Sequence, residues 1–258
     1  MKLRLVGLTG SLVAAAAMLS LQSSARAETF TYSSYTVPNE QTITITSPSN
    51  AYGGMGQIDL TGSAPSSAGI TIMAWCLDVY TYLLGDGYGG SGPFAYNVSL
   101  LTPATSAIGF GTSDKTPASE VGSLTSTQIA EIGGLIGYGN ANISKASVSA
   151  ATQLAIWETE YGNLFKFTGV STATEDQAAT EIADLGKFIS LDSNVALLTA
   201  VAGESNQTLA YDPNLGSSRI DPSPTPLPGT LPLFATGIGL AALFGWRRKR
   251  SSAAFITA

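Results

Sequence analysis

The order of apolar and polar residues divides the chain into a strand-rich part and a helix-rich part. From residue 28 to about residue 112, short segments alternate apolar and polar side chains, most clearly in residues 41–46 and 69–75. A period of two is typical of half-buried strands. The pattern therefore predicts a β-rich N-terminal lobe, built as a sandwich or as a barrel-like sheet.

From about residue 123 the period changes to that of a helix. Thr125 or Ser126 is suited to cap the N-terminus of a helix over residues 125–138. The apolar positions of this segment recur three or four residues apart and therefore share one helix face. They are Ile129, Ile132, Leu135 and Ile136.

The rest of the helix-rich part predicts three more helices and a last strand. The helices are expected at residues 145–161, where Gly162 is the C-cap, at residues 174–189 and, as a short fourth, at residues 194–202. Residues 207–211 alternate again and indicate a strand that returns to the sheet.

These elements predict an α+β body over residues 28–215. Its β-rich lobe covers about residues 28–112, and its helical lobe of three to four helices covers about residues 123–205. A closing strand at residues 206–212 completes it. A body of this length is sufficient for one sizeable domain or two small lobes.

The first 27 residues predict a secretory signal peptide. Two basic residues, Lys2 and Arg4, precede an apolar run from about residue 5 to residue 21. Ala25 and Ala27 then form an A-x-A cleavage signature. Cleavage before residue 28 exports the mature chain, and the alternative is an uncleaved N-terminal anchor.

The C-terminal part predicts a membrane anchor. A proline-rich spacer, residues 216–228, is expected to be extended. Residues 227–246 carry no charge over 20 positions, about the length that crosses a bilayer core. The basic cluster behind them stays on the cytoplasmic side by the positive-inside rule, so that the body is displayed outward. The cluster consists of Arg247, Arg248, Lys249 and Arg250.

The order of these tail motifs resembles the PEP-CTERM sorting signal of Gram-negative bacteria that make extracellular polysaccharide. The resemblance covers about residues 224–250, with the transmembrane sorting signal at 229–250, a helix that ends at Trp246 and a short tail at 251–258. It implies that residues 229–246 insert in the inner membrane, where an exosortase recognises the tail and releases the protein outward. One departure is that Pro226, Leu227 and Pro228 stand where the name-giving motif has Pro-Glu-Pro.

The composition excludes most enzyme chemistry. The 258 residues contain no histidine and one cysteine, so no Ser-His-Asp triad, imidazole zinc site, disulfide or iron-sulfur cluster is available. Residues 28–221 hold all 18 acidic residues but only 5 of the 12 basic ones, hence a net charge of −13. This acidity argues against nucleic acid as a partner, because phosphate binding needs clustered Lys and Arg.

Two short motifs surround the lone cysteine and one glutamine. The first is Trp75-Cys76-Leu77, followed by Asp78, and the second is Gln153-Leu154-Ala155-Ile156-Trp157. Together they resemble the signature segments of bacterial thioester domains, which are found in surface proteins. The resemblance implies an internal bond between Cys76 and Gln153.

The chemistry of such a bond follows from the two residue types. A thiolate held against a glutamine side-chain amide attacks its carbonyl carbon and expels ammonia, which leaves a thioester. A buried thioester resists water and acylates an amine brought close, so the protein would attach itself covalently to a surface or matrix nucleophile. Trp75 and Trp157 are expected to exclude water from the bond, in surroundings that include Leu77, Asp78 and Ile156.

Two alternatives remain open for the body. One is a non-covalent structural or exopolysaccharide-associated matrix protein, in which Cys76 is a buried free thiol. The other is an enzyme that acts on polysaccharide through paired carboxylates. This enzyme is disfavoured because no carboxylate pair stands out, Glu158 and Glu160 being on different helix faces, and two buried acids close together would favour it. We expect that the protein is not an enzyme and that it binds no cofactor and no metal ion.

Overall fold

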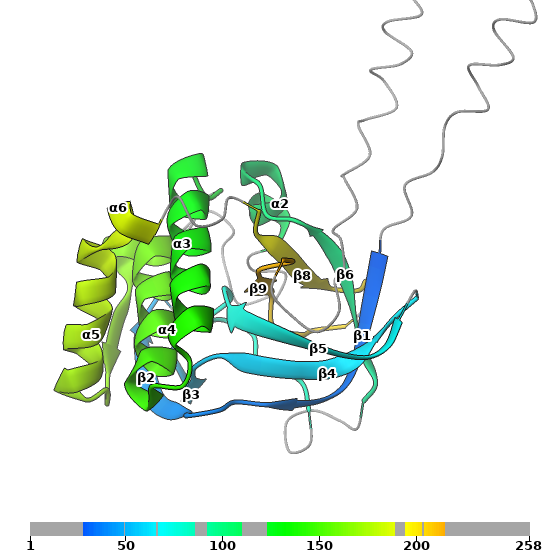
Figure 1. Cartoon of the computed structure of the whole chain (residues 1–258), viewed down its shortest axis with the longest axis horizontal. Helices are drawn as coiled ribbons and strands as arrows, with labels where there is room; N and C mark the ends of the chain where they lie inside the picture. Colours follow the sequence, from blue (N-terminus) through cyan, green and yellow to red (C-terminus); the bar gives the residue numbers. More distant parts are fainter. Residues whose placement is uncertain are drawn as a thin grey trace, which may run out of the picture. The chain divides into compact units, whose positions relative to one another are not determined.

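Six antiparallel strands close into a barrel in the order β1-β4-β5-β9-β8-β6 in a computed structural model of the chain (Figure 1). The structure describes residues 28–48, 50–65, 67–85, 92–109, 123–188, 194–202 and 204–214, which belong to one compact unit, Arg26–Pro224. The strands are β1 (Glu28–Thr36), β4 (Ile58–Ala64), β5 (Ser67–Cys76), β6 (Phe94–Leu100), β8 (Ala196–Ala200) and β9 (Leu209–Tyr211). A barrel-like sheet is thus observed, but β8 and β9, from beyond the predicted β-rich lobe, are needed to close it.

A second sheet of three strands lies beside the barrel in the order β3-β2-β7. It is formed by β2 (Gln41–Ser47), β3 (Ala51–Met55) and the short β7 (Lys166–Thr168). In β2 the residues that point inward are Ile43 and Ile45, which are 2% and 4% exposed. The alternation predicted for residues 41–46 is thus confirmed, and β7 brings a segment of the helix-rich part back to this sheet.

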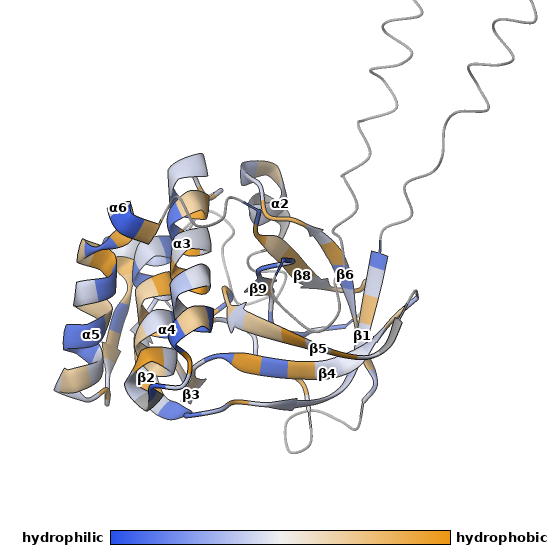
Figure 2. Cartoon of the chain, viewed as in Figure 1, coloured by the Kyte–Doolittle hydropathy of each residue, from blue (hydrophilic) through white to orange (hydrophobic). Residues whose placement is uncertain are grey.

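Helices α3 (Ser126–Asn142), α4 (Ala146–Tyr161), α5 (Thr172–Ala183) and α6 (Leu185–Phe188) pack together as a layer (Figure 1). The short helix α2 (Pro103–Gly109) follows β6 and stands apart from this layer, and the 3-10 turn Gly162–Leu164 follows α4. The central helix α4 packs against both α3 and α5. In Figure 2, α5 carries many hydrophilic residues, as expected for a helix on the outside of this layer.

The predicted ends of α4 hold within one residue, and α3 begins where predicted but continues to Asn142, past the expected end at residue 138. Thr125 caps α3 in a capping box, because its side chain accepts from the backbone N–H of Gln128 and the Gln128 side chain accepts from the N–H of Thr125. Helix α4 ends at Gly162, whose φ of 54° lies in the left-handed region that favours glycine.

Two predicted elements differ from the structure. The expected helix 174–189 is interrupted at Asp184, which separates α5 from α6. The expected short helix at 194–202 is wrong, because residues 196–200 form strand β8 between β6 and β9. A short apolar run has no period that distinguishes helix from strand. Here the neighbouring strands supply backbone partners on both sides, and these decide the conformation.

Several expectations fall outside the described residues. These are the signal peptide with Ala25 and Ala27, the motif Pro226-Leu227-Pro228, and the transmembrane segment with Trp246 and its basic cluster. Within the described part of the chain, no helix combines the length and apolar character needed to cross a membrane.

Candidate functional site

Cys76 is the last residue of β5, at the point where the chain leaves the barrel. It is a free thiol and is 6% exposed. On one side Cys76 lies opposite Leu209 of β9, and the next residue, Leu77, donates its N–H to the carbonyl of Thr208 at 3.0 Å. The cysteine is therefore fixed at a strand end beside the segment that leads into β9.

Gln153 of α4 holds the main chain of Cys76 from the other side. Its Oε1 accepts from the N–H of Cys76 at 2.9 Å, and its Nε2 donates to the carbonyl of Cys76 at 2.8 Å. Strand β4 begins at Ile58 opposite Ala74, so Gln153 supplies backbone partners where this strand is absent. The structure thus brings Gln153 to Cys76 as predicted, but to its backbone and not to its sulfur.

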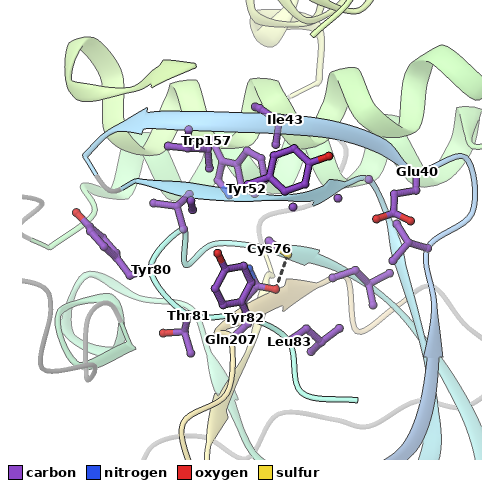
Figure 3. Close-up of a pocket in the computed structure, with 18 of the residues that line it drawn as sticks. Glu40, Ile43, Tyr52, Cys76, Tyr80, Thr81, Tyr82, Leu83, Trp157 and Gln207 are labelled. Carbon is purple, nitrogen blue, oxygen red and sulfur yellow. Dashed lines mark hydrogen bonds between the residues drawn. The ribbon is translucent and has the colours of Figure 1, made fainter. Parts of the chain in front are cut away.

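Gln207 is the residue whose side-chain amide meets the sulfur. The Cys76 Sγ–H donates to Oε1 of Gln207 at 3.0 Å (Figure 3). The amide is oriented by a second bond, since Nε2 of Gln207 donates to the carbonyl of Asp78 at 2.8 Å. Sequence reasoning did not single out Gln207, although it immediately precedes the predicted closing strand.

The backbone around Gln207 is also fixed. Its carbonyl accepts from the hydroxyl of Tyr96, a residue of the barrel core, at 2.7 Å. Its N–H donates to Oδ1 of Asn206, which also accepts from the N–H of Leu84 at 2.9 Å. The segment 204–208 and the segment 77–85 are therefore joined to each other and to the barrel, which holds the amide and the thiol in register.

Burial favours the neutral form of the Cys76 thiol. Burial raises the pKa of Cys76 above its usual range, and the nearby carboxyl groups of Asp78 and Glu160 raise it further. Asp78 is 3% exposed, and its Oδ1 accepts from the N–H of Tyr80 at 2.8 Å. The S–H group is consequently a hydrogen-bond donor, and the acceptor that it meets is the Gln207 carbonyl oxygen.

The other predicted site residues divide into two groups. Trp157 lies at the site, where its ring lines the groove beside Cys76, whereas the Leu77 side chain is fully buried in the core and its carbonyl accepts from the Tyr161 hydroxyl at 2.9 Å. Trp75 points elsewhere, because its Nε1 donates to Asn140 of α3 at 3.1 Å. Ile156 is fully buried in the core. Of the two tryptophans expected to exclude water, only Trp157 is placed to do so.

A groove of about 150 Å³ leads to the sulfur. Figure 3 shows Cys76 and Gln207 within it, Tyr52 and Trp157 along one wall, and Glu40 at one end. Among the described residues, no cluster of three or more Cys, Asp or Glu side chains is arranged to hold a metal ion.

Comparison with known proteins gives a loose likeness of fold. No protein-family model matches the sequence, and no curated protein matches it. Among solved structures, the N-terminal thioester domain of a surface protein from Clostridium perfringens aligns over 75% of this chain and 99% of that chain. The sequence identity is 13% and the TM-score is 0.40. The N-terminal thioester domain of the fibronectin-binding protein SfbI from Streptococcus pyogenes aligns over 70% of this chain and 95% of that chain, with the same identity and TM-score. With an identity of 13% and a TM-score of 0.40, these likenesses give no information on chemistry, and the chemistry of the site is inferred from the contacts of Cys76 alone.

Proposed function

We propose that this chain is an exported bacterial surface or matrix protein that attaches itself covalently to an amine through an internal thioester between Cys76 and Gln207. The observation that carries the proposal is the 3.0 Å contact between Sγ of Cys76 and Oε1 of Gln207, in a buried site that opens on a groove. Export and sorting by the PEP-CTERM-like tail rest on the sequence motifs alone.

Thioester formation exchanges one bond for another at the Gln207 side chain. The sulfur attacks the carbonyl carbon Cδ, and the thiol proton passes first to Oε1, toward which the S–H group already points. When the tetrahedral carbon collapses, the bond from Cδ to Nε2 breaks and the nitrogen leaves with that proton as ammonia. The contact between Nε2 and the Asp78 carbonyl orients the leaving nitrogen.

Attachment to a target then consumes the stored bond. A neutral primary amine attacks Cδ of Gln207, the new C–N bond forms, the C–S bond breaks, and the proton lost by the amine goes to Sγ. The product is an amide on Gln207 and a free Cys76 thiol. Because the bond is consumed once and not regenerated, the protein is a covalent binder and not an enzyme.

The structure favours Gln207 over Gln153 as the acyl partner. Both polar atoms of the Gln153 amide are already used by the backbone of Cys76, and an attack on this amide would break both contacts. We assign Gln153 the role of holding the strand end on which the thiol is carried. This differs from the pairing of Cys76 with Gln153 that the sequence motifs indicated.

The proposal is tested by the intact mass of the purified body. We expect it to fall short of the sequence mass by one ammonia, and methylamine to add to residue 207 in a peptide map while one thiol becomes titratable. Cys76→Ala and Gln207→Ala should each show the full sequence mass. Methylamine found on residue 153 would restore the pairing with Gln153. A full mass with a free thiol in the unheated wild-type protein would favour the non-covalent matrix protein.

A further inference from the structure

The groove beside Cys76 is lined by exposed aromatic rings. Of the large hydrophobic side chains in the described residues, three are exposed, and two of these, Tyr52 at 66% and Tyr82 at 50%, line this groove. Exposed rings contribute little to the core, and their faces attract cations because of the ring quadrupole. Two such rings beside the proposed acyl group point to a ligand that carries positive charge.

Glu40 is the only charged residue that lines the described groove. Its side chain is exposed, and no hydrogen bond or ion pair joins it to another described residue. The backbone leaves space for it, since a Cβ at Gly54 would overlap its carboxylate. An exposed carboxylate at one end of an otherwise uncharged groove suits a cationic ligand better than a neutral or acidic one.

The volume of the groove matches a small ligand or a single side chain. A volume of about 150 Å³ is close to that of a cavity that holds one benzene molecule, roughly six heavy atoms. This accommodates an unbranched alkyl chain that ends in an amine. Apolar lining residues such as Ile43, Val79 and Leu83 are compatible with the methylene groups of such a chain.

Building on the proposed thioester, we propose that this groove selects primary amines that carry a second positive charge. One amino group reacts at Cδ of Gln207, and the second charge is bound by the Glu40 carboxylate and the ring faces of Tyr52 and Tyr82. Glu40 exchanges no proton in the reaction and acts as a specificity residue. The ligand class is a diamine, or a lysine followed by another basic group on a partner. The net charge of −13 on residues 28–221 favours approach of the same class.

The test compares reaction rates of matched amines. Second-order rate constants for loss of the thioester are measured with 1,5-diaminopentane and with pentylamine, and are expressed per amino group. We expect the wild-type protein to prefer the diamine by about two- to fivefold, the effect of an exposed ion pair, and added salt to reduce this preference. Glu40→Gln should bring the ratio to about one. Glu175→Gln, which makes the same charge change on α5 outside the groove, should keep the wild-type ratio.

The outcomes separate this inference from the proposed function. If the thioester forms but the wild-type and Glu40→Gln proteins show the same ratio, the groove does not select a second charge and the thioester stands. If the mass measurement shows no thioester, binding of the same two amines to Cys76→Ala protein is compared by ligand-observed NMR. Preferential binding of the diamine that is lost in Cys76→Ala/Glu40→Gln supports the groove, and equal binding overturns it.

Discussion

Gln153 and Gln207 present the same functional group to two different parts of Cys76. The amide of Gln153 pairs with the N–H and carbonyl of a buried strand end, whereas the amide of Gln207 contacts the sulfur and the Asp78 carbonyl. One residue type therefore supports the backbone of Cys76 at one position and meets its sulfur at the other. The same substitution at each position separates the two roles.

We expect Gln153→Leu to lower the free energy of unfolding by about 2 to 4 kcal/mol, because it leaves two buried backbone groups without partners. When both substitutions are made in Cys76→Ala protein, which carries no thioester cross-link, Gln207→Leu should cost less than Gln153→Leu, since the Gln207 side chain is only half-buried. Urea unfolding measures both. The intact mass should respond to the other substitution: Gln207→Leu abolishes the loss of ammonia, and Gln153→Leu does not. A Gln153→Leu protein as stable as the wild type would show that its two contacts are not structural.

Close packing of helix α3 against strand β5 fixes the position of the strand that carries Cys76. Helix α3 approaches β5 at Gly139, where a Cβ would lie 2.7 Å from Cζ2 of Trp75 and 2.8 Å from Cγ2 of Thr152. Since neither neighbour is the end of a flexible chain, a side chain at residue 139 forces α3 away from β5 and α4. Trp75 thus anchors β5 to the helical layer while Cys76, the next residue, meets Gln207.

Gly139→Ala is expected to destabilise the protein by about 1 to 2 kcal/mol. Overpacking costs roughly 1 to 3 kcal/mol, and the better helix propensity of alanine offsets up to about 1 kcal/mol of it. Thermal unfolding and near-UV circular dichroism of the tryptophans measure the change. Gly186→Ala on α6 is the control, because its Cβ meets no atom within 4 Å, and it should be neutral or slightly stabilising. Equal stabilities for the two variants would contradict the close packing at residue 139.

Among the residues that the structure describes, several acidic groups are buried or partly buried, and no Lys or Arg side chain is buried beside them. Burial raises the pKa of several carboxyl groups above their usual values. They are Asp59, Asp78, Glu158, Glu160 and Glu181. Within the described part of the chain the ion pair that forms is Lys187 with Asp184, at the surface. The protein contains no histidine, so these carboxyls dominate its pH dependence between about pH 4 and pH 8.

The unfolding free energy is expected to fall as the pH rises from about 4.5 toward neutrality. A carboxyl with a raised folded-state pKa holds its proton in the folded state at a pH where the unfolded chain has lost it. Its contribution is complete below the ordinary pKa and is lost as the pH passes through the folded-state pKa. Glu160→Gln, at a residue that is 4% exposed, should flatten part of this dependence in urea unfolding between pH 4.5 and pH 8. A wild-type stability that rises over this range would contradict the assignment.

The sequence by itself determined the local elements and the residue types available for chemistry. The period of two placed the strands β2 and β5, and the helical period with its capping residues placed α3 and α4 within a few residues. The absence of histidine and the single cysteine already restricted the site to Cys76. The positions of these strands and helices depend on residues close together in the sequence, so the local pattern of apolar and polar residues predicts them.

Only the tertiary structure decided which glutamine meets the sulfur and whether residues 196–200 form helix or strand. Gln153 lies 77 residues from Cys76 and Gln207 lies 131 residues away, and both reach it because β5, β9 and α4 converge at one strand end. The short apolar segment 196–200 is a strand because β6 and β9 offer backbone partners on both sides. Pairings across such separations depend on closure of the barrel, and no local period records them.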